Sequence, residues 1–296
     1  MSTPPLGSSL FFLTCSLVTT GCAFQSALPF FSPTRTHTLQ IRLPSAPSSS
    51  PSPPPPPAFS TVTITSLRSP PPVGGLVYPA SRLALRHLLS LPPSSSPLPI
   101  VDAGAGVGLA AVSLAKAGRE VTAVDFDPDV VQLLRGNAAR NKANLTARVL
   151  DLTDLKAVET LPSPCHLLCC DLVYHSGASA LPLTLLSVLS RDPASRVTLV
   201  LVNRFGGAGV AALAGIAGVR GESARPSPTP LDGTVTDGEI AGFMKSAEEA
   251  GLRLTRVEVG REVRREVLEE LVWWERGKWE MLGIIDDLKI YEVALK

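Results

Sequence analysis

Short apolar runs alternate with longer amphipathic segments from about residue 59 to the end of the chain. The apolar runs predict strands, which in chain order are Val62–Ile64, Pro99–Val101, Val121–Val124, Thr146–Leu150, His166–Cys170, Val197–Val202, Leu254–Val259 and Ile290–Leu295. The amphipathic segments predict helices, which are Arg82–Leu89, Gly108–Ala117, Pro128–Ala139 and Asp237–Ala250. The pattern predicts an α/β, Rossmann-like fold with a seven-stranded, mostly parallel sheet and helices on both faces. Such a sheet binds ligands at the carboxyl ends of its strands.

Residues at two ends of these predicted helices suit their positions. Ser81 can cap the N-terminus of the first helix, because its hydroxyl accepts a hydrogen bond from a free backbone N–H. Gly251 stands directly after the last helix, where a left-handed residue commonly ends one. Both features support the predicted boundaries.

The N-terminal region lacks this alternation and divides into two parts. The apolar run within Ser9–Thr20 is too short to span a bilayer but suits a signal peptide, with small residues Gly21 and Ala23 before a cut at Phe24. The next part, Gln25–Ala58, is rich in Ser and Pro and contains no acid. It predicts a disordered transit peptide or linker. The predicted division is therefore 1–23 signal peptide-like, 24–58 disordered and 59–296 one folded domain.

A signal peptide followed by a transit-like stretch resembles the two-part presequence of algae with secondary plastids. We therefore expect localisation in the plastid. The secretory pathway and other organelles are alternatives. We expect no stable membrane insertion.

The composition narrows the class of protein. With 296 residues, 45% of them hydrophobic, the chain can bury a large core, and its formal net charge of +1 argues against a nucleic-acid partner. Three of its five cysteines, Cys165, Cys169 and Cys170, border or fill an apolar strand, which predicts buried free thiols. No CxxC pair with partner histidines occurs, so no metal site is expected. We expect a monomer.

A glycine-rich loop follows the predicted strand that ends at Val101. Its candidate cofactor-binding residues are Gly104, Ala105, Gly106 and Gly108. Glycines at such a turn allow a ligand to approach the backbone, and the helix that follows offers free N–H donors. Read from Gly104, a dinucleotide pattern fails at Leu109, but read from Gly106 it ends acceptably on Ala111. The glycines alone therefore leave a nicotinamide cofactor open.

Acidic residues beside the loop favour S-adenosyl-L-methionine as the cofactor. Asp102 precedes the loop, where its carboxylate could meet a methionine ammonium or its water shell but would repel a pyrophosphate. Asp125 closes the next strand, 17 residues after Gly108, and can accept hydrogen bonds from both ribose hydroxyls. We include the neighbouring Phe126 among the cofactor-binding residues.

Two further strand ends carry candidate residues. Asp151 and Leu152 follow the third strand of the alternating region, where Asp151 could accept from the adenine amine and Leu152 could cover the ring; an ordinary helix N-cap is the alternative for Asp151. Asp171 and Tyr174 follow His166–Cys170 and are the candidate catalytic residues. A carboxylate can hold an ammonium until it loses its proton, and an aromatic wall favours cationic alkylamines.

Together these segments resemble the seven-β-strand (class I) S-adenosylmethionine-dependent lysine methyltransferases of family 16. The resemblance rests on Gly74–Ser81, the loop Val101–Leu109, Asp171-x-x-Tyr174, and the pattern Leu-x-x-Asn-x-x-x-Asn that places Asn137 and Asn141. It implies that Tyr78, in an aromatic-Pro segment, contacts the cofactor, and that the methyl group goes to a protein side chain, usually lysine. Some relatives modify histidine or arginine. Tyr78 and Leu152 stand where the family commonly has Trp.

Other functions remain open from the residues alone. A small-molecule N-methyltransferase would have the same fold, and a nicotinamide-dependent oxidoreductase would have a similar glycine loop. A catalytically silent scaffold would bind neither S-adenosylmethionine nor a nicotinamide cofactor. The histidines form no triad with a GxSxG motif, which argues against a hydrolase.

Overall fold

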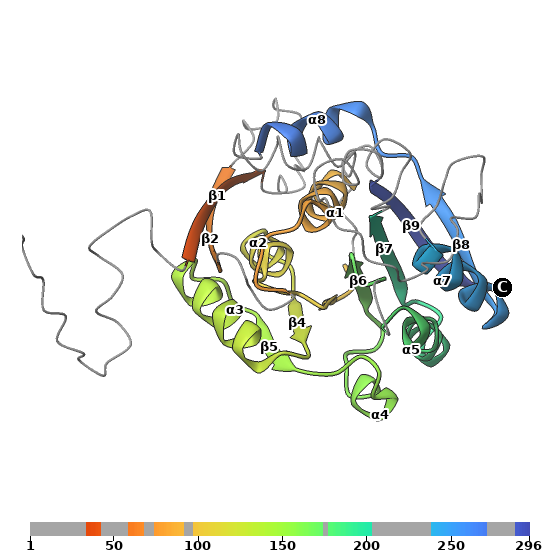
Figure 1. Ribbon diagram of the computed structural model, residues 1–296. Coiled ribbons are helices and arrows are strands. Elements are labelled where there is room, and N and C mark those ends of the chain that lie inside the picture. Colours follow the sequence, from red (N-terminus) through yellow and green to blue (C-terminus); the bar gives the residue numbers. More distant parts are fainter. Residues whose placement is uncertain are drawn as a thin grey trace, which may run out of the picture. The chain divides into compact units, whose positions relative to one another are not determined.

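The computed structural model describes residues 34–42, 59–67, 74–91, 97–173, 177–202, 238–270 and 288–296. Among them, seven strands form one sheet in the order β5-β4-β3-β6-β7-β9-β8, and β1 and β2 form a separate two-stranded sheet (Figure 1). The predicted signal peptide lies outside the described residues, and so does the candidate catalytic residue Tyr174.

The large sheet is parallel from β5 to β7, and β9 runs antiparallel to both β7 and β8. Its strands are β3 (Ile100–Ala103), β4 (Val121–Asp125), β5 (Thr146–Val149), β6 (His166–Cys170), β7 (Arg196–Val202), β8 (Leu252–Val257) and β9 (Leu288–Leu295). The prediction of a seven-stranded, mostly parallel, Rossmann-like sheet is confirmed. The carboxyl ends of β3, β4, β5 and β6 meet at one edge, where the predicted site residues lie.

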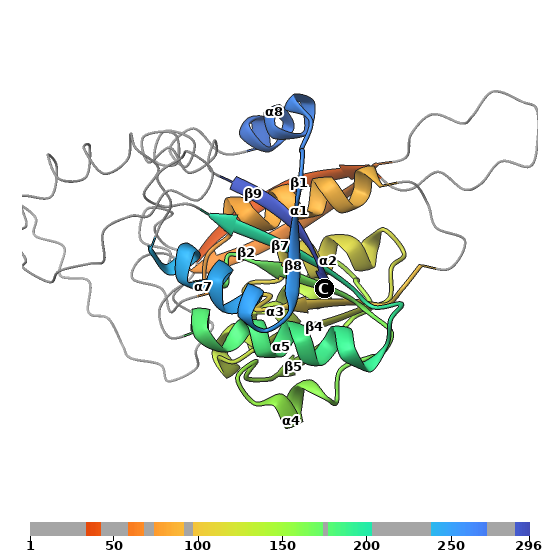
Figure 2. The ribbon, with the colours of Figure 1, turned by 90° about the vertical axis from the view of Figure 1, so that its right-hand side faces the viewer.

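Helices cover both faces of this sheet (Figures 1 and 2). One face carries α1 (Pro79–Ser90), α2 (Leu109–Lys116) and α3 (Pro128–Arg140). The other face carries α4 (Leu155–Val158), α5 (Gly177–Arg191) and α7 (Gly238–Glu249), and α8 (Arg261–Glu270) packs against α1. No helix within the described ranges is long and apolar enough to cross a membrane.

Alternate residues of the central strands pack into different cores. In β6, Leu167 and Cys169 join the core under α5 and α7, whereas Leu168 and Cys170 contact the core under α1 and α2. Such two-sided burial explains why the central strands are mostly apolar rather than alternating between apolar and polar residues. Cys165 and Cys169 are free and buried, as predicted, and burial raises the pKa of the Cys169 thiol above its ordinary value.

The β1 strand corrects the predicted extent of disorder. β1 (Thr34–Arg42) pairs antiparallel with β2 (Phe59–Leu67), so the prediction that residues 24–58 are disordered is wrong for these nine residues. Alternate residues of β1, His37 and Leu39, are buried, and His37 Nε2 lies 2.8 Å from Ser66 Oγ. The Ser/Pro-rich composition of the surrounding segment hid this short alternation.

The first helix begins earlier than predicted. Its N-cap is Tyr78, with extended backbone, and Pro79 occupies the first helical position, so the assignment of Ser81 as the cap is wrong. Proline fixes φ near the helical value and lacks the N–H that would have no partner there. The Ser81 hydroxyl instead donates to the Tyr78 carbonyl at 2.8 Å.

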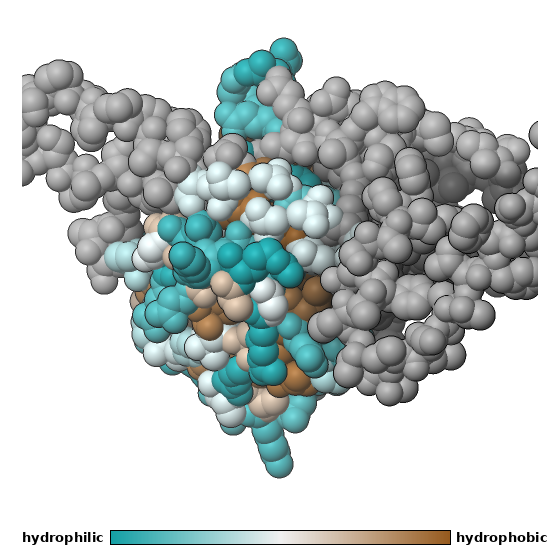
Figure 3. Space-filling view, turned by 90° about the vertical axis from the view of Figure 1, so that its left-hand side faces the viewer, coloured by the Kyte–Doolittle hydropathy of each residue, from teal (hydrophilic) through white to brown (hydrophobic). Residues whose placement is uncertain are grey.

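The side of the domain formed by the β1–β2 sheet and α3 is mainly hydrophilic where its residues are described (Figure 3). The exposed face of α3 carries Asp129, Gln132, Arg135 and Arg140, and its inner face buries Val131 and Leu134. This amphipathic pattern is the one from which the helix was predicted.

Candidate functional site

The glycine loop connects β3 to α2 through a backbone conformation that favours glycine. The φ angles of Gly104, Gly106 and Gly108 are 62°, 54° and 86°. Ala105 N donates to Val124 O at 2.9 Å, which joins the loop to β4, and Gly108 N donates to Ala105 O at 3.0 Å. The left-handed φ values explain why these three positions are glycine.

Two distant segments lie directly against this loop. A Cβ on Gly106 would stand 2.8 Å from the carbonyl oxygen of Gly74, and one on Gly104 would stand 2.3 Å from Leu172 Cδ2. The structure therefore brings together the segment before α1, the glycine loop and the segment after β6. These are the three motifs that the resemblance joined.

Asp125 connects the end of β4 to the loop. It is 5% exposed, and its Oδ2 accepts from Gly106 N at 2.9 Å while Oδ1 accepts from Asp127 N at 3.2 Å. Burial raises the pKa of this carboxyl, against the effect of these backbone N–H donors. A carboxylate has about four lone-pair sites, so Asp125 retains capacity for a further hydrogen bond, and its contact with the ribose hydroxyls stays a prediction.

Asp102 lies under the loop rather than beside it. Its side chain is 3% exposed, and Oδ2 accepts from Ala111 N in the first turn of α2 at 3.0 Å. Burial raises its pKa to about 7. The bond to α2 was not anticipated, and the contact with the methionine ammonium stays a prediction.

Phe126 follows Asp125 and is 57% exposed, although a ring of this size is usually buried. Val149, paired with Asp125 across β4 and β5, is 50% exposed. Two apolar side chains at one sheet edge offer a surface that a flat aromatic ring could cover. The contact of Phe126 with the cofactor stays a prediction.

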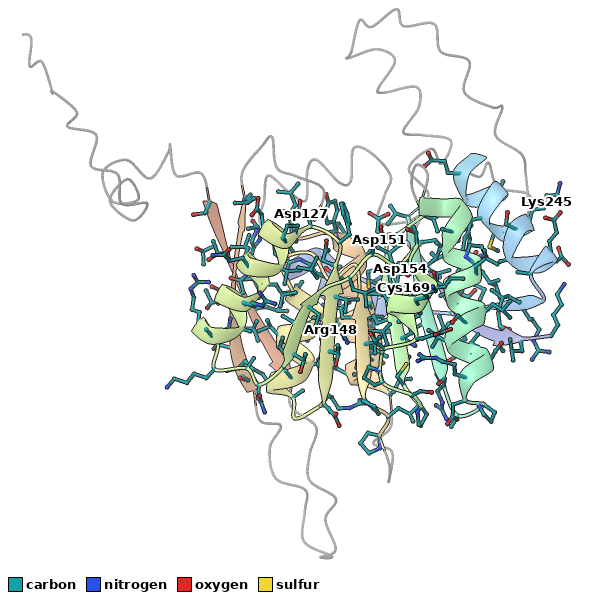
Figure 4. All side chains as sticks on the ribbon, turned by 90° about the horizontal axis from the view of Figure 1, so that it is seen from below. Asp127, Arg148, Asp151, Asp154, Cys169 and Lys245 are labelled. Carbon is teal, nitrogen blue, oxygen red and sulfur yellow. The ribbon has the colours of Figure 1, made fainter. Side chains whose placement is uncertain are left out.

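Asp151 and Leu152 lie at the carboxyl end of β5 and differ in burial. Asp151, which is labelled in Figure 4, is exposed. Its Oδ1 accepts from Thr153 N and from Thr153 Oγ1, both at 2.8 Å. The N-cap of α4 is Asp154, so the helix-cap alternative for Asp151 is wrong. Leu152 is half-buried against the core under α5, where its carbonyl accepts from Thr184 Oγ1 at 2.6 Å. The adenine contacts of both residues stay predictions.

Asp171 has a backbone conformation that is rare outside glycine. Its φ is 57°, and its N–H donates to Val200 O at 2.8 Å at the end of β6. Asp is among the few residues that adopt this region, and such positions are enriched at active sites. The catalytic role of Asp171 stays a prediction.

Tyr78 lies at the end of the segment whose Gly74 touches the loop. It is half-buried and precedes α1 in extended conformation. The segment is joined to β2 by the bond from Leu67 N to Gly75 O at 2.8 Å. Its predicted contact with the cofactor stays a prediction.

These residues fit S-adenosylmethionine as a group. Glycine backbone without Cβ atoms can receive the methionine part, the buried Asp125 carboxylate the ribose, and the exposed Phe126 the adenine. Within the described ranges, no cluster of three or more His, Cys, Asp or Glu is placed to hold a metal ion.

Comparison with known proteins agrees with this geometry. Residues 100–184 match the family model described as a methyltransferase domain, which spans β3 to the middle of α5. The fold is that of a class I methyltransferase. S-adenosylmethionine is the cofactor of this domain.

Individual relatives match over short segments. The 23S rRNA (uracil(1939)-C(5))-methyltransferase RlmD of Halomonas elongata is 41% identical over 75 residues, covering 24% of this chain and 16% of that protein. A release factor glutamine methyltransferase of Koribacter versatilis is 37% identical over 83 residues, covering 27% and 29%. The chain thus spans less than a third of either relative. A solved structure of magnesium protoporphyrin IX methyltransferase (ChlM) from Synechocystis PCC 6803 is 17% identical, covers 76% of this chain and 84% of that one, and has a TM-score of 0.46.

Several contacts of the site were not predicted from the sequence. No role was predicted for Leu172, which lies inside the Asp171-x-x-Tyr174 motif, or for Asn137. The polar residue at an inward-facing position of α3 was the available signal for Asn137, because a buried amide needs partners. No sequence signal shows which partners those are.

Proposed function

We propose that this domain transfers the methyl group of S-adenosylmethionine to a protein side chain, namely the ε-amine of lysine. The observation that carries the proposal is the contact of Leu172 with Gly104, which holds the neighbouring Asp171 beside the cofactor loop. An acid at this place is next to the point where the methyl group would be presented. The family resemblance, with its lysine substrates, supports the finer proposal.

The reaction requires no covalent catalysis by the protein. The lone pair of the neutral amine attacks the methyl carbon, the sulfur–carbon bond breaks with its electron pair to sulfur, and the nitrogen loses a proton. Most of the rate then comes from holding donor and acceptor in line. Asp171 would bind the ammonium before it loses its proton and orient the amine afterwards.

Two buried carboxylates favour a methyl donor over a nicotinamide dinucleotide. Gly106 N–H already donates to Asp125 Oδ2, whereas a pyrophosphate bound on this loop would use that donor. Asp102 lies directly under the same loop. A pyrophosphate would be repelled by these carboxylates in their ionised form, whereas a ribose hydroxyl or a methionine ammonium would not.

Calorimetry with purified protein tests the cofactor. We expect S-adenosylhomocysteine to bind with a micromolar Kd and NAD to give no heat above dilution. Binding of NAD without binding of S-adenosylhomocysteine would overturn the proposal and support the oxidoreductase. Absence of both would support the silent scaffold.

Methyl transfer to extract components tests the acceptor. An extract of the source cells is incubated with tritiated donor and separated into protein and low-mass fractions. We expect label in protein and, after digestion and mass spectrometry, on lysine. Label confined to the low-mass fraction would instead identify the small-molecule N-methyltransferase, and label on another side chain would correct the residue type.

We also propose that the chain is imported into a plastid through its N-terminal segment. The composition of residues 1–58 supports this, because a signal peptide-like run is followed by an acid-free, Ser/Pro-rich stretch. A C-terminal fluorescent fusion of the full chain should colocalise with plastid pigment, and the same fusion without residues 1–33 should not. Secretion of the full fusion would contradict plastid import.

A further inference from the structure

Two asparagines on α3 bind the backbone of β2 in the same way. Asn141 Oδ1 accepts from Thr63 N at 2.7 Å and its Nδ2 donates to Thr63 O at 2.6 Å. Asn137 Oδ1 accepts from Thr65 N at 2.9 Å and its Nδ2 donates to Thr65 O at 2.9 Å. Each amide thus satisfies both backbone groups of one residue, as a neighbouring strand would.

Asn137 differs from Asn141 in one contact. Its Nδ2 also donates to Val107 O, in the glycine loop, at 2.9 Å. Asn137 is fully buried, and Arg140 Nη1 donates to its Oδ1 at 2.7 Å, so both amide hydrogens and both oxygen lone pairs are used. Asn141 Nδ2 donates its second hydrogen bond to the carbonyl oxygen of Asn137, within α3, at 2.7 Å.

Asn137 therefore joins the two walls of the cofactor site. One wall is the glycine loop, which it holds at Val107. The other is the segment around Gly74, which is positioned by β2 through the bond from Leu67 N to Gly75 O. Because the carbonyl of Gly74 lies against Gly106, a small shift of either wall would change the space for the ligand.

We propose that Asn137 is a positioning residue that preorganises the cofactor loop, whereas Asn141 only attaches β2 to α3. The inference rests on the proposed cofactor. A loop that loses the Asn137 bond has to be ordered when the ligand binds, and that ordering lowers the affinity.

The matched variants Asn137→Leu and Asn141→Leu test this proposal. Both replace an amide with an apolar side chain of similar shape and leave one β2 residue without its partners, so both should lower Tm. Only Asn137→Leu should also raise the Kd for S-adenosylhomocysteine, by about tenfold, the effect of one hydrogen bond to a buried carbonyl. Asn141→Leu should leave that Kd within about twofold.

Hydrogen exchange separates loop ordering from general destabilisation. Amides of residues 104–108 should exchange faster in Asn137→Leu than in Asn141→Leu, both without ligand. Equal Kd values for the two variants, or equal exchange in the loop, would overturn the proposal. If the wild type itself does not bind S-adenosylhomocysteine, the proposed function fails; if it binds and both variants bind equally, only the role of Asn137 fails.

A milder pair keeps the test valid if the leucine variants do not fold. Asn137→Asp keeps an acceptor for Thr65 N beside Arg140 but cannot donate to Val107 O. Asn141→Asp is its control, because it loses the bonds that Asn141 Nδ2 donates to Thr63 O and to Asn137 O, neither of which is in the glycine loop. The same difference in Kd is expected, and its absence counts against Asn137.

Discussion

Among single side chains, Asp125 and Asp171 carry most of the proposed chemistry, and they act at different points. Asp125 is bonded to the loop and faces the cofactor side of the site. Asp171 stands at the end of the neighbouring strand in a left-handed conformation. A change at the first should therefore alter cofactor affinity, and a change at the second should alter transfer.

Asp125→Asn should weaken the binding of S-adenosylhomocysteine by about tenfold or more. One carboxylate oxygen becomes an NH₂ group, which cannot accept a hydrogen bond. The bond from either Gly106 N or Asp127 N is therefore lost. Calorimetry gives the Kd. Asp127→Asn is the control, because Asn caps α3 as well as Asp does and should leave the Kd within about twofold. Equal effects of both changes would contradict the role of Asp125.

Asp171→Asn should reduce methyl transfer by about a hundredfold and leave the Kd for S-adenosylhomocysteine unchanged. Asn tolerates the positive φ, so the change removes the charge without new backbone strain. Initial rates with labelled donor measure the effect. Asp192→Asn, which lies in a turn before β7, is the matched control and should keep full activity. Full activity of the Asp171 variant would show that its carboxylate is not needed.

Among the secondary-structure elements, the β1–β2 sheet is the one whose existence was least expected. It is separate from the large sheet, but its β2 strand is bonded to α3 and leads into the segment against the glycine loop. The element therefore belongs to the cofactor site, although β1 occurs within a segment that resembles a presequence.

Two truncations test the contribution of β1. Removal of residues 1–33 should leave Tm within about 1 °C, because it leaves β1 and its pairing with β2 intact. Removal of residues 1–43 should lower Tm by several degrees, roughly the effect of 1–2 kcal/mol, because β2 loses its partner strand and Leu39 leaves the core. Thermal unfolding followed by circular dichroism measures both. Equal Tm values would show that β1 contributes nothing to stability.

For the molecule as a whole, the stability below pH 7 should depend on two buried titratable groups whose pKa values are shifted in opposite directions. His166 has its pKa lowered to about 4, by burial first and then by Arg119, Arg196 and His87. Asp102 has its pKa raised to about 7 by burial. As pH falls below 6.5, the unfolded chain protonates its histidine before the folded one does, so His166 lowers stability. Asp102 acts in the opposite direction, since the folded state takes up its proton first.

His166→Gln should isolate the histidine contribution. In the wild type, His166 Nε2 lies 2.8 Å from Thr198 Oγ1. Glutamine can still form a hydrogen bond to this hydroxyl, but it does not titrate. Between pH 6.5 and about 4, Tm of the wild type should fall more steeply than that of the variant, while above pH 6.5 the two profiles should run parallel. Parallel profiles over the whole range would contradict the lowered pKa.

Whether a feature of the fold or of the site could be predicted from the sequence depends on how far apart in the chain its contacting residues lie. The large sheet, the loop glycines and the acid at each strand end were predictable, because strand burial and turn geometry leave local patterns at fixed spacing. The partners of Asn137, the contact of Leu172 with Gly104 and the pairing of β1 with β2 were not, because each joins residues far apart in the chain. Local patterns select elements and the class of cofactor loop, whereas packing between distant elements selects which polar groups find partners. For that reason only the folded chain reveals that an inward-facing asparagine joins both walls of the site.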